Sequence, residues 1–155
     1  MKKATLCYIS RYNGLNREYL MLYRNRKQND PNEGKWIGVG GKFEPGETPD
    51  ECMLREVREE TGLELMSYHF CGVIHFISDT WEDEDMYLYR AEAGASIKTP
   101  ACEEGELRWI PEDQLMDLPM WKGDRLFLKP LLEGVDAISM TLHYEGDDLV
   151  AAEVD

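Results

Sequence analysis

The chain has few basic residues for its length. Its 155 residues include 17 Lys+Arg against 31 Asp+Glu, a formal net charge of −14. Proteins that bind DNA, RNA or anionic membranes rely on Lys and Arg to neutralise phosphates. The deficit argues against a nucleic-acid polymer or a membrane surface as partner. A small phosphorylated ligand remains compatible with this charge if metal cations bridge the two negative partners.

Cysteines and long apolar runs are also scarce. The four cysteines form no CxxC pair and no zinc-ligand spacing. No segment approaches the roughly 20 apolar residues of a membrane span. The start, MKKATLCYISR, has too short an apolar run for a signal peptide. These absences predict a reduced, cytoplasmic, soluble protein. A monomer and a homodimer both stay open.

An apolar fraction of 43% with 10% aromatics is typical of a globular chain, and the length suits one domain over residues 1–155. Alternating apolar and polar residues, β-branched side chains and turn signals predict mixed α/β structure. We expect strands over 3–10, 18–24, 36–42, 68–77, 86–91, 107–110, 137–144 and 149–154. We expect a brief helix from Pro111 to about Leu118 and another over 124–133.

The strongest local signal is a helix between Thr48 and Gly62. Thr48 and Glu51 have the spacing of a capping box, Pro49 suits the first helical position, and Gly62 suits the position after the last turn. The helix is expected to bury one face in the core, formed by Met53, Leu54, Val57 and Thr61.

A second face of this helix collects carboxylates. Glu56, Glu59 and Glu60 stand at i, i+3 and i+4, and Glu47 lies at the far end of the glycine-rich turn before the helix. One interpretation is a solvated acidic surface. The other is a site for Mg²⁺, which prefers carboxylate and carbonyl oxygens and commonly bridges to substrate phosphates.

The segment from Gly41 to Leu63 resembles the Nudix box, G-x5-E-x7-R-E-U-x-E-E-x-G-U, where U is aliphatic. Every position of the pattern is met, by Gly41, Glu47, Arg55, Glu56, Val57, Glu59, Glu60, Gly62 and Leu63. The resemblance implies the Nudix fold, a mixed β-sheet sandwiched between helices (an α/β/α sandwich). It also implies hydrolysis of a diphosphate linkage with Mg²⁺ or Mn²⁺ and a metal-activated water.

The same resemblance assigns roles within the box. Glu56, Glu59 and Glu60 are expected to bind the metal and take part in catalysis, with the carbonyl of Gly40 as a backbone ligand. Arg55 and Glu47 are expected to hold the loop and the helix in register. Gly41 and Gly62 are structural positions of the box.

Outside the box, the chain resembles the 8-oxo-dGTP diphosphatases within this family. The resemblance lies in the stretch from Gly34 to Thr48, in Met120-Trp121 followed by Asp124, and in the C-terminal strand pair. It implies a purine base read by Trp121 and Asp124. Two positions depart from the pattern: Ile37 replaces a base-reading asparagine, and Gly123 replaces the first of two aspartates.

Three further residues are candidates by position. The resemblance suggests a phosphate contact for Lys27, a base-pocket wall for Phe76 and an additional catalytic carboxylate for Glu104, with Glu103 and Glu106 as substitutes. Plainer interpretations stay open: Lys27 as a surface lysine, and Phe76 and Trp121 as core residues.

The sequence therefore predicts a Mg²⁺-dependent nucleoside triphosphate pyrophosphohydrolase acting on a small nucleotide. The products would be a monophosphate and pyrophosphate, and 8-oxo-dGTP is the first candidate substrate. One alternative is a Nudix hydrolase of another diphosphate derivative, such as ADP-ribose. The other is a non-catalytic nucleotide-sensing module, which the intact set of box glutamates disfavours.

Overall fold

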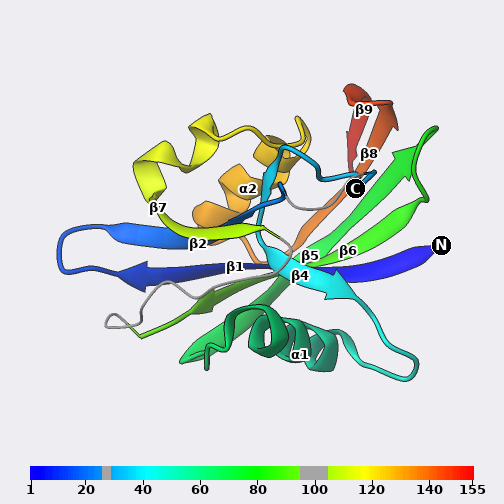
Figure 1. The fold of residues 1–155 in the computed structure, drawn as a ribbon. Helices are drawn as coiled ribbons and strands as arrows, with labels where there is room; N and C mark the ends of the chain where they lie inside the picture. The colour runs from blue at the N-terminus through cyan, green and yellow to red at the C-terminus, as the bar shows by residue number, and fades with distance from the viewer. Residues whose placement is uncertain (26–28, 95–104) are drawn as a thin grey trace.

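The computed structural model describes residues 1–25, 29–94 and 105–155. Its elements follow one another along the chain as Figure 1 shows. They are β1 (Lys2–Tyr12), β2 (Arg17–Tyr23), β3 (Trp36–Ile37), β4 (Val39–Lys42), α1 (Pro49–Thr61), β5 (Ser67–Ser78), β6 (Glu84–Glu92), β7 (Glu106–Pro111), the 3-10 helix η1 (Glu112–Asp117), α2 (Asp124–Leu132), β8 (Ile138–Glu145) and β9 (Asp148–Val154).

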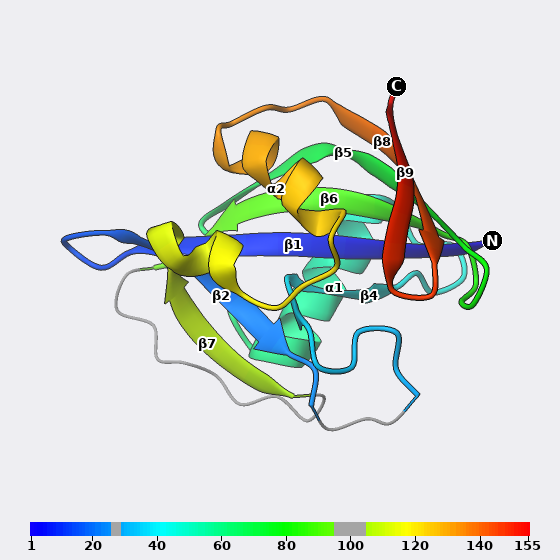
Figure 2. The ribbon, with the colours of Figure 1, turned by 90° about the horizontal axis from the view of Figure 1, so that it is seen from above.

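The strands of the described residues form one mixed sheet with the order β3-β2-β1-β6-β5-β8-β9, to which β4 adds beside β1 and β7 beside β2. The pairs β1–β6 and β5–β8 are parallel, whereas the other pairs are antiparallel. Helix α1 covers one side of the sheet, and α2 with η1 covers the other (Figures 1 and 2). The predicted α/β/α sandwich is confirmed.

The segment expected as one strand over 36–42 is two strands, which corrects that prediction. β3 pairs with β2, whereas β4 pairs with β1, so the chain changes partner at Gly38. A Cβ on Gly38 would lie 2.8 Å from the carbonyl oxygen of Cys7. The switch places β4 and β2 one after the other along the same edge of β1.

Helix α1 forms for the local reasons that its sequence indicates. The Thr48 backbone N–H donates to Glu51 at 2.9 Å, and the Glu51 N–H donates to the Thr48 hydroxyl at 3.2 Å. Gly62 has φ of 69° and donates its N–H to the Arg58 carbonyl at 2.9 Å. The capping prediction is confirmed.

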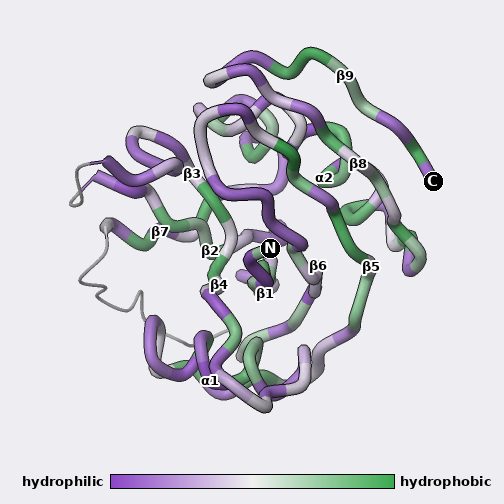
Figure 3. The backbone as a smooth tube through the Cα atoms, turned by 90° about the vertical axis from the view of Figure 1, so that its right-hand side faces the viewer, coloured by the Kyte–Doolittle hydropathy of each residue, from purple (hydrophilic) through white to green (hydrophobic). Residues whose placement is uncertain are grey.

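The two faces of α1 differ as expected. Hydrophilic and hydrophobic residues mix along this helix (Figure 3), and Met53, Val57 and Thr61 are buried while Leu54 is half-buried. Cys52 is also buried, close to the Thr5 hydroxyl. The acidic face is therefore carried on a helix whose other face packs against the sheet. Within the described residues, neither helix is long and apolar enough to cross a bilayer.

Candidate active site

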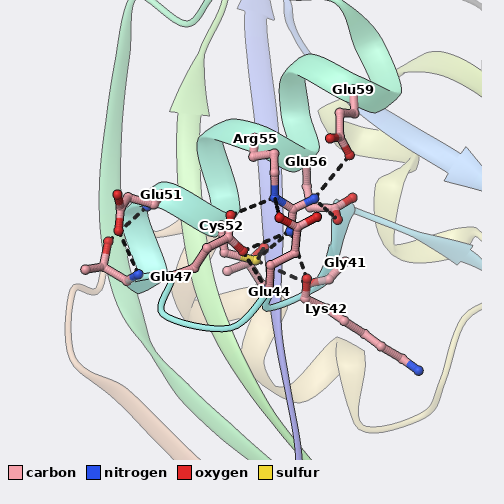
Figure 4. Close-up of polar contacts among 11 residues, drawn as sticks. Gly41, Lys42, Glu44, Glu47, Glu51, Cys52, Arg55, Glu56 and Glu59 are labelled. Atoms are coloured by element: carbon pink, nitrogen blue, oxygen red, sulfur yellow. Dashed lines mark hydrogen bonds and ion pairs between the residues drawn. The ribbon is translucent and has the colours of Figure 1, made fainter.

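Arg55 ties the glycine-rich turn to α1. Its Nε donates to Glu47 Oε2 at 2.6 Å and its Nη2 donates to Glu47 Oε1 at 2.9 Å, a two-pronged contact that fits the planar guanidinium. The same Nη2 donates to the carbonyl oxygen of Lys42 at 2.9 Å, at the end of β4. Figure 4 shows the guanidinium lying among these acceptors. Arg55 therefore bridges strand, turn and helix.

Arg55 also orients two of the box glutamates. Its Nη1 donates to Glu56 Oε1 at 2.8 Å and to Glu59 Oε2 at 3.1 Å. The contact with Arg55 is the main cause that lowers the pKa of Glu47 to about 2, and Glu47 in turn is the main cause that raises the pKa of Arg55. Glu47 and Arg55 are therefore both charged across the physiological range.

Two glycines let β4 approach its neighbours. A Cβ on Gly40 would lie 1.8 Å from the backbone oxygen of Thr5, and a Cβ on Gly41 would lie 2.4 Å from the carboxyl carbon of Glu56. Such distances are far inside van der Waals contact. At Gly40 the obstacle is backbone, whereas at Gly41 a side chain would force the Glu56 carboxylate away from its present position.

A cavity of about 470 Å³ brings most of the sequence candidates together. Gly40, Gly41, Glu56 and Glu60 line it from β4 and α1. A second group, from β3, β5 and the region where α2 begins, consists of Ile37, Phe76, Trp121 and Asp124. Box carboxylates and the base-reading candidates thus share one cavity.

Of the four residues expected to bind the metal, Glu59 does not line this cavity. Glu59 stands on the outer flank of α1, with its side chain 59% exposed and bound to Arg55. Lys27 and Glu104 lie outside the described residues, as does Glu103. The i, i+4 pair Glu56 and Glu60 therefore faces the cavity, and the i+3 member lies beside it.

Trp121 combines packing with a place on the cavity wall. Its side chain is only 5% exposed, and it meets Phe76 edge-to-face at 5.3 Å and Tyr144 at 4.8 Å. Its Nε1 donates to the Asn32 side-chain oxygen at 2.9 Å, and the Lys35 ammonium lies 4.3 Å from the ring centroid. Trp121 therefore belongs to the core and also lines the cavity, while its contact with a base stays a prediction.

Asp124 is a carboxyl group in a low-dielectric setting. It is 6% exposed, and burial raises its pKa from 3.8 to about 7, with Arg125 and Lys35 acting in the opposite direction. Near neutral pH it exists in both protonation states. The protonated form, which prevails below pH 7, can donate a hydrogen bond, whereas the charged form above pH 7 only accepts.

Asp124 is expected to make the protein less stable as the pH rises. Its pKa is higher in the folded than in the unfolded chain, so its contribution is fully present below about pH 4 and is lost as the pH passes 7. Urea unfolding of the wild type and Asp124→Asn should show the wild type losing ~3 kcal/mol relative to the variant between pH 5 and pH 8. Asp113→Asn, at an exposed position, is the matched control. If the free energies of unfolding of the wild type and Asp124→Asn changed equally between pH 5 and pH 8, this assignment would be wrong.

The structure also places residues in the cavity that the sequence did not single out. They come from the sheet, from the loop between β2 and β3 and from the loop between β5 and β6, and include Lys2, Asn32, Trp81, Glu84 and Met86. Strand alternation could have suggested the inward side of each strand. It could not have indicated which strands lie side by side.

The oxygen atoms that could act as metal ligands at the cavity suit a hard divalent cation. Among residues 1–25, 29–94 and 105–155, no three His, Cys, Asp or Glu side chains are grouped closely enough to hold a metal ion. Mg²⁺ is nevertheless commonly bound by one or two carboxylates together with waters and substrate phosphates. The carboxylates of Glu56 and Glu60, beside the backbone of Gly40, fit that requirement.

Comparisons with known proteins agree with this geometry. A family model described as NUDIX domain matches residues 2–131. The chain is 31% identical over 121 residues to the uncharacterized Nudix hydrolase YvcI of Bacillus subtilis, covering 74% of this chain and 75% of that protein. It is 35% identical over 104 residues to an oxidized purine nucleoside triphosphate hydrolase of Danio rerio, covering 64% of each.

The fold has a close counterpart among solved structures. The MutT protein from Bacillus halodurans superposes with a TM-score of 0.82 at 26% sequence identity, covering 100% of this chain and 98% of that one. The similarity therefore extends beyond the box to the entire sheet and both helical layers.

Proposed function

Because this chain belongs to the NUDIX domain family, and is by that membership a hydrolase of phosphoanhydride bonds, we propose that its substrate is a purine nucleoside triphosphate. The expected products are the monophosphate and pyrophosphate, and 8-oxo-dGTP is the expected preferred substrate. One observation carries this proposal: the box carboxylates and an aromatic, acid-containing wall line the same cavity. The relative from Danio rerio, named for oxidized purine nucleoside triphosphates, supports it.

The polyphosphate would lie beside α1. We assign Glu56 and Glu60, with the Gly40 carbonyl, to hold Mg²⁺ or Mn²⁺, and we keep Glu59 as the outer member of the set. A bound divalent ion would neutralise phosphate charge and favour ionisation of a water. Arg55 fixes the carboxylate of Glu56 before any ligand arrives, so this oxygen donor is already oriented. The protein itself needs no covalent nucleophile for this reaction.

The base would lie against Trp121 and Phe76. The planes of the two rings stand at 77° to each other, so a purine would stack on the face of one ring beside the other. Asp124 supplies a polar group at this surface whose protonation state changes near neutral pH. The apolar side chain of Ile37 lines the same cavity and offers the base no hydrogen bond. Recognition of the base edge therefore depends on few polar groups.

A panel of nucleotides tests the proposal. The wild-type protein with Mg²⁺ should release pyrophosphate from 8-oxo-dGTP faster than from unmodified triphosphates, and should turn over ADP-ribose slowly. Removing the divalent ion with EDTA should abolish turnover, and adding Mn²⁺ should restore it. The readouts are pyrophosphate for the triphosphates and AMP for ADP-ribose.

Two results would contradict the proposal in different ways. Negligible turnover of 8-oxo-dGTP beside fast turnover of ADP-ribose would assign the chain to another diphosphate substrate. Tight nucleotide binding with no hydrolysis of any compound in Mg²⁺ would identify a sensing module rather than an enzyme.

A further inference from the structure

Three side chains from three neighbouring strands form a row on the cavity wall. Lys2 of β1 is the register partner of Glu84 in β6, and Glu84 is the register partner of Phe76 in β5. Residues directly opposite each other in paired strands project from the same face of a sheet. All three line the cavity. The Lys2–Glu84 pair therefore lies beside Phe76 on the same wall of the cavity.

The ion pair is short and partly shielded from water. Lys2 Nζ lies 2.7 Å from Glu84 Oε2, and the two side chains are 23% and 18% exposed. An ammonium has three donors and a carboxylate about four acceptor positions, so one mutual contact leaves both groups able to bind a ligand. The pair thus presents a donor and an acceptor side by side.

The pair lies close to the groups assigned to the base. Phe76, at the end of the row, contacts Trp121 edge-to-face at 5.3 Å. The negative charge of Glu84 acts on Asp124, where it adds to the effect of burial in raising the pKa of that carboxyl group. Two carboxyl groups from distant parts of the chain, Glu84 and Asp124, therefore face one cavity.

We propose that the Lys2–Glu84 ion pair reads the H–N–C=O edge of an oxopurine base, a specificity role that rests on the proposed function. In such an edge an N–H donor stands next to a carbonyl acceptor. The carboxylate of Glu84 accepts from the N–H, and the ammonium of Lys2 donates to the carbonyl oxygen. Oxidation at C8 adds this edge to a purine, guanine already has one at N1 and C6, and adenine has none. The pair therefore selects for oxopurines over adenine.

Binding of monophosphates tests this role apart from hydrolysis. dAMP and 8-oxo-dAMP differ only at N7 and C8, where oxidation creates the edge. Calorimetry with the wild type should give a Kd for 8-oxo-dAMP about 10- to 100-fold lower than for dAMP, as expected for hydrogen bonds to charged groups. In Glu84→Leu and in Lys2→Met this ratio should fall toward one, mainly through weaker binding of 8-oxo-dAMP. Glu84→Gln keeps an acceptor oxygen, so its ratio of the two Kd values should lie between the wild-type ratio and one.

Matched controls come from the same strands. Lys3→Met removes an exposed charge next to Lys2, and Glu92→Leu removes one at the opposite end of β6. Both should keep the wild-type ratio. Circular dichroism melting identifies any variant that does not fold, and Lys2→Met, at the first residue of β1, provides a test independent of Glu84.

The inference is overturned if the wild type binds the two monophosphates equally, or if folded Lys2→Met retains the full preference. Failure of the proposed function looks different. In that case no purine triphosphate is hydrolysed, while the wild type still prefers 8-oxo-dAMP and the variants still lose this preference.

Discussion

Glu60→Gln is expected to lower kcat by about 10²- to 10⁴-fold while the protein stays folded. Glu60 lines the cavity beside Glu56, where the proposed roles are to bind the metal and to help move the proton of the attacking water. An amide of the same size is a poorer ligand for a hard cation and cannot accept that proton. Steady-state pyrophosphate release under saturating Mg²⁺ measures the loss.

The fold should not suffer from this change. Glu56 and Glu60 are like charges at i and i+4, a pairing that costs a helix a few tenths of a kcal/mol. Neutralising one of them should leave the melting temperature unchanged or slightly higher. Glu64→Gln, at an exposed position beyond the helix, is the control for losing one glutamate charge. More than half of the wild-type activity in Glu60→Gln would refute the assigned role.

Gly40→Ala is expected to destabilise the fold by ~3 kcal/mol or more and to abolish turnover at 25 °C. The added Cβ would lie 1.8 Å from the backbone oxygen of Thr5. Because backbone is the obstacle, no side-chain rotation relieves the clash, and β4 has to move away from β1. That movement would separate the glycine strand from Glu56, so activity and stability should fall together. Urea unfolding and pyrophosphate release measure the two effects.

Gly46→Ala separates this clash from a general effect of losing a glycine. A Cβ at Gly46 meets nothing within 4 Å, but its φ of +80° suits glycine, so the cost should be only ~1–2 kcal/mol. Gly46 lies in the turn before α1 and does not line the cavity. If Gly40→Ala were as stable as Gly46→Ala, close approach of β4 to β1 would not be what Gly40 provides.

The sequence alone determined α1 and the chemistry that it carries. The helix start is encoded by Thr48, Pro49 and Glu51 and its end by Gly62, and all four act through contacts within a few residues. The contact of Arg55 with Glu47 also followed from the box. Local spacing suffices for such features because a helix fixes which residues share a face. It did not separate Glu59, on the outer flank of α1, from Glu56 and Glu60, which line the cavity.

Only the tertiary structure decided what surrounds the box. At the switch of strand partner, Gly38 lies against the backbone of Cys7, a residue far from it in the chain. The row of Lys2, Glu84 and Phe76 depends on the register of strands far apart in the chain, and no local pattern encodes register between non-neighbouring segments. The raised pKa of Asp124 depends on burial, which several elements create together. The class of bond that is cleaved was therefore readable from one helix, whereas the groups that face the base exist only once the sheet has assembled.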